Sequence, residues 1–368
     1  MTSDYKPISG KLIFDSLRDM NCIVMAANIR MLPSIEGIMQ AATEKRATLL
    51  FEIAKSEIGY TGLAPAEYYE SITRKASELG FDIPYAIHAD HITVKSPGEA
   101  DVQSAEDLIK AELSAGFTSF AIDASHIYDT EGESVAERLA GNIDVTTKLA
   151  KLIPKEFSLE VEVGEIGKKD PKTGKQELTT VEEAVTFIEA LQANGIEPDL
   201  IATHNGSTHG NIYDAEGNVI EQVGIDEQRT RDIAKAIKHL GVQIAQHGIT
   251  GTPLNLMHRL IDAGIAKGNV ATNWQNIAID SFPKDLNEKM KSWTMASEQV
   301  AAMRQKKPNM SDGEILGKNI KHAIKVHKDL IAQLTPDQQA KVTKATKESA
   351  MAFFEAFNAV GSADAVKL

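Results

Sequence analysis

Eight short apolar runs, separated by longer segments with helical spacing, constrain most strongly what this chain can fold into. Continuous apolar runs of this kind are typical of parallel strands that are covered on both faces. Eight strand–helix units are the number in a closed (β/α)8 barrel, the TIM barrel, so we predict an α/β protein of this architecture. A doubly wound open sheet is the alternative. The predicted strands are Cys22–Ile29, Thr48–Ala54, Tyr85–Asp90, Ser119–Ser125, Phe157–Val163, Leu200–Asn205, Val242–His247 and Asn269–Asn273.

The segments between and after these runs indicate where the barrel ends. Glycines stand shortly before several runs and are expected to end the preceding helices, at Gly116, Gly195, Gly241 and Gly264. Beyond Pro283 the chain is charged and has helical spacing. We therefore predict a (β/α)8 catalytic domain over residues 1–282 and a C-terminal helical extension, packed on the barrel, over residues 283–368.

The charge balance excludes some classes of partner. With 39 Lys and Arg against 52 Asp and Glu, the net charge of -13 argues against a surface for nucleic acid or anionic membranes. No apolar segment reaches the roughly 18 residues of a membrane span, and the first residues do not resemble a signal peptide. The single cysteine, Cys22, has no internal partner. We expect a cytoplasmic protein.

Histidines gather at the carboxyl ends of the predicted strands. Barrel enzymes build their active sites at that end, so this distribution predicts one functional site. Six of the ten histidines follow the pattern: His88, His91, His126, His204, His209 and His247.

The segment from His88 to His91 (HADH) is the sharpest motif. Strand alternation places His88 and Asp90 on one side, with His91 at the turn over the barrel mouth. His91, His209 and His247 follow strands three, six and seven, so their imidazoles can converge on one zinc-like ion and leave a position open for substrate. A polar strand end with purely structural hydrogen bonds is the alternative for the motif.

Acidic residues form a second group. Glu160 and Glu162 are two residues apart in one strand and therefore share a face, and Asp123 ends the preceding strand. A carboxylate in a barrel interior needs a cation or a hydrogen-bond donor. For Glu162 and Asp123, direct metal ligation and orientation of a ligand histidine both stay open.

Two loops have compositions that bear on the site. Gly164–Gly174 is rich in Gly and Lys and reads as a mobile lid or a plain solvated loop. Gly248–Pro253 follows strand seven and offers backbone N–H groups to an anion such as phosphate.

Taken in order, these motifs resemble those of the class II, zinc-dependent fructose-bisphosphate aldolase family. The resemblance implies that Asp90 is the catalytic acid and base and that His91, His209 and His247 bind the metal, with Glu162 at an alternative metal position. Asp123-Ala-Ser125 and Glu160-Val-Glu162-Val-Gly164 match further family motifs, and Asn273 matches an asparagine that contacts substrate. The residues expected to bind substrate are Asn28, His88, Gly210, Gly248, Thr250, Asn273, Gln275 and Asn276.

The chain departs from the family where phosphate is gripped. Thr250 keeps a hydroxyl in a changed loop, Gln275 and Asn276 replace an aspartate and a threonine, and Tyr213 replaces a lysine. Asp170 is the one candidate for the acid of the mobile loop. The resemblance implies cleavage of fructose 1,6-bisphosphate, with a different or less phosphorylated ketose as the alternative, and a homodimer or larger homo-oligomer.

Cleavage beside a ketone needs an electron sink, either a lysine Schiff base or a metal ion. None of the eight runs contains a lysine, and Lys55 only follows the second. We therefore expect the metal route, with Asp90 taking the proton of the hydroxyl on carbon 4 and with Asp170 or Glu165 exchanging the donor-carbon proton. A barrel metal-dependent hydrolase and a non-catalytic homologue are the rivals.

Overall fold

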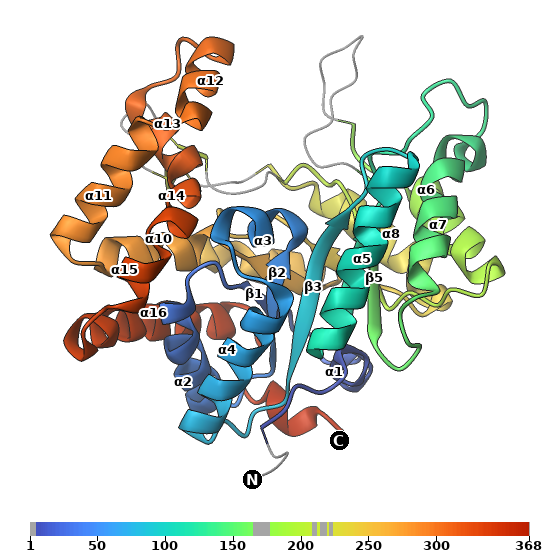
Figure 1. The fold of residues 1–368 in the computed structure, drawn as a ribbon. Helices are drawn as coiled ribbons and strands as arrows, with labels where there is room; N and C mark the ends of the chain where they lie inside the picture. The colour runs from blue at the N-terminus through green and yellow to red at the C-terminus, as the bar shows by residue number, and fades with distance from the viewer. Residues whose placement is uncertain (1–4, 165–176, 208–211, 214–218, 221–223, 368) are drawn as a thin grey trace.

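A computed structural model describes residues 5–164, 177–207, 212–213, 219–220 and 224–367 (Figure 1). Eight parallel strands close into a barrel in the order β1-β10-β9-β6-β5-β4-β3-β2. This closure confirms the predicted (β/α)8 barrel over the open sheet. The strands are β1 Val24–Asn28, β2 Leu49–Ala54, β3 Tyr85–Thr93, β4 Ser119–Asp123, β5 Ser158–Glu162, β6 Leu200–Ala202, β9 Gln243–Gln246 and β10 Ile265–Val270. A separate antiparallel pair joins β7 (Ile212–Tyr213) and β8 (Val219–Ile220).

Helices follow the strands and cover the outside of the barrel, because the apolar residues of the strands form one buried cluster with apolar residues of the helices. The α7 N-cap Thr180 accepts a hydrogen bond from Glu183 N, and Gly116, with φ of 105°, ends α5 in the left-handed region as predicted. These helices are α2 Ile35–Lys45, α4 Pro65–Leu79, α5 Glu99–Ala115, α6 Val135–Ala150, α7 Val181–Ala193, α8 Glu227–Ile237 and α9 Met257–Asp262.

The amino-terminal end of the barrel is closed by α1 (Gly10–Leu17). Its apolar residues Ile13, Phe14 and Leu17 belong to the same buried cluster as Leu50 of β2. Gly10 N donates to the carbonyl of Thr118, just before β4. The other end of the barrel is therefore the open one.

The eighth strand lies earlier than predicted. Its bounds are Ile265–Val270 rather than Asn269–Asn273, and Asn273 falls in α10 (Thr272–Ser281). The strand was not predicted at these residues because Lys267 interrupts its apolar pattern, and a lysine is rarely buried in a protein interior. The correction matters because Lys267 then lies inside the barrel.

The C-terminal region is helical, as expected, but more broken. Helices α11–α13 rise beside the barrel and α14 lies next to α3 (Lys55–Thr61), as Figure 1 shows and the contacts between the helices confirm. Helix α16 packs along α2 and α10, and the division at residue 282 stays a prediction. The elements are α11 Lys284–Met295, α12 Glu298–Lys306, α13 Asp312–Asn319, the 3-10 turn η4 Ile320–His322, α14 Ala323–Val326, α15 Lys328–Ala332 and α16 Pro336–Ala356. Within the described residues, no helix has the length and apolar character to cross a membrane.

Close packing of α2 on α16 predicts a destabilising substitution. A Cβ at Gly37 would lie 2.4 Å from the carbonyl oxygen of Thr343, so Gly37→Ala should force the helices apart. Overpacking costs about 1–3 kcal/mol, which exceeds the gain of about 1 kcal/mol in helix propensity. We expect a lower thermal midpoint of unfolding. The control Gly59→Ala, in α3 with nothing within 4 Å of the added carbon, should keep or raise it. Equal midpoints for the two variants would contradict this account of the packing.

Candidate active site

A β-bulge in β3 brings the two central residues of the site together. His88 and Ala89 pair with Ser119 and Phe120 of β4, and the register then shifts so that Ile92 pairs with Ile122. Two residues of β3, Asp90 and His91, therefore stand opposite one residue of β4. His91 has φ of 44°, in the left-handed region. This conformation costs free energy for a residue other than glycine and is often found at functional sites. The sequence predicted a turn at His91, whereas the structure continues the strand through it.

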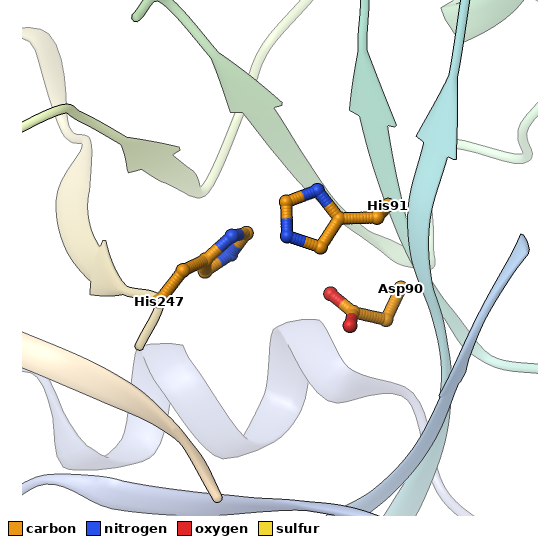
Figure 2. A group of neighbouring side chains, drawn as sticks. All are labelled: Asp90, His91 and His247. Carbon is orange, nitrogen blue, oxygen red and sulfur yellow. The ribbon is translucent and has the colours of Figure 1, made fainter. Parts of the chain in front are cut away.

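His91 and His247 face each other across the open end of the barrel (Figure 2). Their ring centroids are 4.2 Å apart with an interplanar angle of 72°. Asp90 lies beside them, and each of the three offers one ligand-type atom within 4.8 Å of the others. Two of the three predicted metal ligands are thus close enough to share an ion. The third, His209, lies outside the described residues, as do Gly210, Asp170 and Glu165.

Two carboxylates extend the same group of ligand atoms. Oε1 of Glu162 lies 3.0 Å from Nδ1 of His91 and 2.8 Å from Nδ1 of His247. Oδ2 of Asp123 lies 3.4 Å from Nδ1 of His91. Although Oε1 of Glu162 is buried, it has no hydrogen-bond partner among the described residues. Imidazole nitrogens and carboxylate oxygens that converge in this way are the ligand types of a divalent cation such as zinc.

The pKa values of His91 and Glu162 reflect how these side chains interact when no metal ion is bound. Burial lowers the pKa of His91, but the carboxylates Glu162, Asp90 and Asp123 together outweigh burial and raise the pKa to about 9. Burial and the neighbouring Asp123 raise the pKa of Glu162 well above its usual range. A divalent cation would relieve the repulsion between these carboxylates and displace the proton of His91, because metal ligands bind deprotonated.

Behind His247, a buried carboxylate fixes the ring. Nε2 of His247 lies 2.6 Å from Oε1 of Glu160 and is hydrogen-bonded to it. The other oxygen of Glu160 lies 2.9 Å from Nζ of Lys267. An imidazole that donates from one nitrogen to a carboxylate presents the other to a metal, a common pattern in metalloproteins. Glu160 therefore has the position of an orienting carboxylate for His247, a predicted metal ligand.

His88 belongs to the layer beneath the site. Its Nδ1 is hydrogen-bonded to Oγ of Ser119 at 2.6 Å, and its Nε2 lies 3.3 Å from Nζ of Lys267. Burial and Lys267 lower its pKa to about 3, so the ring is neutral. The side chain has no exposed surface. The prediction that His88 binds substrate is therefore wrong for this arrangement.

The expectation that no barrel strand contains a lysine is wrong, because Lys267 lies in β10. A Schiff base on a strand lysine therefore has to be considered again. However, the ammonium of Lys267 lies 3.1 Å from Glu52 and 2.9 Å from Glu160 and is fully buried. Burial opposes its charge, but Glu160 and Glu52 outweigh burial and raise its pKa above the usual range. A nucleophilic lysine needs a lowered pKa and access to substrate. The lysine route stays disfavoured, for a different physical reason.

A cavity of about 710 Å³ opens above these residues and is lined by Asp90, His91 and His247. Asp90 accepts hydrogen bonds from Nδ2 of Asn28 at 2.9 Å and of Asn269 at 3.1 Å. Burial opposes its charge, but His91 and Lys267 outweigh burial and lower the pKa of Asp90 to about 2. Asp90 is therefore a fixed carboxylate at the cavity wall.

The predicted substrate contacts fall into two groups. Asn28, Gly248 and Thr250 line the cavity. Asn273 instead donates to Oγ of Ser349 at 3.0 Å, and Gln275 accepts from Arg30 at 3.1 Å. Among the described residues that line the cavity, Asn273, Gln275 and Asn276 are not present.

The shifted strand explains the error. Asn269 holds the place that was given to Asn273, and Gly264, read as a helix end, was the signal that β10 begins at Ile265. Several other residues that line the cavity were not predicted from the sequence; they are Arg30, Glu57, Tyr60, Asn269 and Lys321.

A closed parallel barrel with imidazoles and carboxylates converging at its open end defines the class of metal-dependent barrel enzymes. Residues 9–318 match the family "Fructose-bisphosphate aldolase class-II", and the chain belongs to this family of carbon–carbon lyases. The chain is 27% identical to the fructose-bisphosphate aldolase of Streptococcus pneumoniae and 29% identical to that of Streptococcus pyogenes. Each match covers 73% of this chain and 80% of the relative.

Solved structures share the fold. The fructose-bisphosphate aldolase of Campylobacter jejuni has a TM-score of 0.63 at 18% identity, covering 97% of this chain and 96% of that one. The YdjI aldolase of Escherichia coli has a TM-score of 0.60 at 18% identity, covering 96% and 97%.

The hydrogen bond between Glu160 and His247 predicts a loss of metal affinity. Glu160→Gln removes the charge that Lys267 and His247 share, so the ring of His247 should be held less firmly. Loss of such an outer partner weakens metal binding about 10- to 100-fold. Chelator competition with zinc measures the change, and Glu189→Gln on the exposed face of α7 is the matched control. The assignment of Glu160 fails if both variants bind zinc as the original protein does.

Proposed function

We propose that this chain is a zinc-dependent aldolase that cleaves a ketose phosphate reversibly, with fructose 1,6-bisphosphate as the default substrate. Its products are then dihydroxyacetone phosphate and glyceraldehyde 3-phosphate. The observation that carries the proposal is the placement of the Asp90 carboxylate beside two imidazoles at one cavity wall. The relatives named fructose-bisphosphate aldolase support the default substrate.

The ion would be held by His91, His247 and, as the resemblance implies, His209, with Glu162 and Asp123 close by. When bound, it supplies Lewis acidity toward the ketone oxygen of the substrate. Asp90 takes the proton from the hydroxyl on carbon 4 as the bond between carbons 3 and 4 breaks, and it returns that proton in condensation. Asn28 and Asn269 hold the two carboxylate oxygens in place for this transfer.

The donor half of the sugar would lie toward the ends of β9 and β10. Gly248, Thr250 and Thr272 line the cavity there. Oγ1 of Thr250 accepts a hydrogen bond from Ala271 N at 3.2 Å, which ties the two loops together. A ketose other than fructose 1,6-bisphosphate is the second candidate, because Thr250 stands in a loop that departs from the family. The loop acid (Asp170 or Glu165), the homo-oligomer and the cytoplasmic location stay predictions.

Metal removal tests the electron sink. Exhaustive chelation should abolish cleavage, and zinc or cobalt should restore it. Borohydride added during turnover should trap no substrate on Lys267, because its ammonium is buried and paired with Glu52 and Glu160. Activity that survives complete chelation, or a covalent adduct on Lys267 in the mass spectrum, overturns the metal route.

Replacement of Asp90 tests the proton transfer. Asp90→Ala should lower kcat about 10²- to 10⁴-fold, the usual contribution of a positioned acid or base, while zinc content stays near that of the original protein. Asp101→Ala is the control, since Asp101 lies at the cavity rim and accepts hydrogen bonds from backbone N–H groups. Near-normal turnover of Asp90→Ala would remove the assignment.

A further inference from the structure

The cavity continues past Asp90, away from the two imidazoles. Nδ2 of Asn28 links Asp90 to Oε2 of Glu57, at 2.9 and 3.3 Å. Oε1 of Glu57 then pairs with Nε of Arg30 at 2.6 Å. Asn28, Glu57 and Arg30 all line the cavity, followed by Tyr60 and Lys321. A polar wall therefore leads from the proton-transferring carboxylate to a group of cations.

Lys321 differs from the other cations along this wall. Arg30 is fixed by Glu57 and by Gln275, whose Oε1 lies 3.1 Å from the guanidinium. Lys55 donates to the carbonyl of Thr93 at 2.9 Å, and Lys95 is exposed. Lys321 is half-buried, and no carboxylate of the described residues lies within 4.0 Å of its Nζ. Its Nζ lies instead 5.2 Å from the ring centroid of Tyr60.

A half-buried ammonium without a counter-charge is costly. Burial and the neighbouring Arg30 lower the pKa of Lys321 and outweigh the attraction of the more distant Glu57, so the surroundings disfavour its charge. An anion bound between Lys321 and Arg30 would remove this penalty. Arg30 is already neutralised by Glu57, so one anionic group on the ligand would balance the charge of Lys321.

The direction of the wall identifies which part of the substrate reaches Lys321. This step rests on the proposed function, in which Asp90 acts on the hydroxyl of carbon 4. Carbon 4 becomes the aldehyde carbon, so the aldehyde fragment extends from Asp90 along Asn28 and Glu57. Among the described residues, Lys321 is the one part of the chain beyond residue 282 that lines the cavity. It lies in η4, which contacts α3.

We propose that Lys321, together with Arg30 and Tyr60, forms a subsite for an anionic group at the end of the aldehyde fragment. The substrate is then a ketose that carries a phosphate or a carboxylate at the end remote from the ketone. The C-terminal helices supply this subsite to the barrel of the same chain. Lys321 determines specificity, and it takes no part in the proton transfer.

The test compares three substrates with Lys321→Met: fructose 1,6-bisphosphate, fructose 1-phosphate, and the 1-phosphate of a ketose with a carboxylate at carbon 6. In the original protein, kcat/KM should be higher for a substrate with a terminal anion, and the better of the two anions identifies the natural one. In Lys321→Met this preference over fructose 1-phosphate should fall roughly 10- to 100-fold, the weight of a hydrogen bond to a charged group. The loss should fall mainly on KM, and Lys321→Arg should restore part of it.

Lys325→Met is the matched control, because Lys325 is an exposed lysine on α14 that does not line the cavity. It should keep the preference, and zinc content and thermal midpoint should be unchanged in both variants. The proposal is overturned if Lys321→Met lowers kcat/KM equally for all three substrates, or changes none of them.

Binding separates this inference from the proposed function. Calorimetry with glyceraldehyde 3-phosphate and with glyceraldehyde measures the subsite even if no ketose is cleaved. Tighter binding of the phosphorylated aldehyde that is lost in Lys321→Met supports the subsite on its own. Equal binding of the two aldehydes by the original protein contradicts it, whereas an inactive protein that still prefers the phosphorylated aldehyde contradicts only the cleavage reaction.

Discussion

The ammonium of Lys267, enclosed by Glu52 and Glu160, is the interaction on which the rest of the site depends. All three side chains are fully buried. Burial and Asp90 raise the pKa of Glu52 well above its usual range, whereas Lys267 and His247 outweigh burial and lower that of Glu160, so Glu160 carries the charge opposite Lys267. Glu160 uses its second oxygen to hold His247, so the ion pair reaches the cavity through one hydrogen bond. Breaking such a buried pair by removing one partner typically costs about 3–5 kcal/mol. The buried ion pair in the barrel interior therefore holds Glu160 in place, and Glu160 in turn fixes the ring of His247 at the open end of the barrel.

The bulge in β3 adds the second constraint. A regular strand would turn Asp90 and His91 to opposite faces. The extra residue and the positive φ of His91 instead let both side chains face one cavity. The carboxylate that we propose transfers the proton and a proposed metal ligand are then neighbours in sequence and in space, and the backbone of β3 holds them side by side. Local strain of this kind persists only where the surrounding structure holds it, and pairing with β2 and β4 on both sides does so.

Much of this arrangement could be predicted from sequence, because parallel strands follow from apolar runs and chemistry gathers at their carboxyl ends. The prediction failed where a residue lies in surroundings that are unusual for its type. Lys267 interrupts the apolar pattern of β10, so the strand was placed four residues late, and Asn273 received the place of Asn269. His88 shares the motif of Asp90 but lies in the buried layer, since motif membership does not give depth in the barrel. The approach of Lys321 could not be predicted at all, because it depends on how η4 packs against α3.

The two parts of the cavity wall have different structural origins, and this difference bears on how substrate range changes while chemistry persists. Asp90, His91 and Asn269 lie on barrel strands whose positions are fixed by pairing on both sides. Lys321 lies on a short turn between helices, where a change of sequence disturbs no strand. Substitutions there would alter the charge presented to the far end of a sugar without moving Asp90. Thr250, in a loop that departs from the family, also lines the cavity from outside the barrel strands. A barrel that keeps its ionic interior can therefore change its substrate from either edge, because neither edge carries the charge balance that holds the reacting groups.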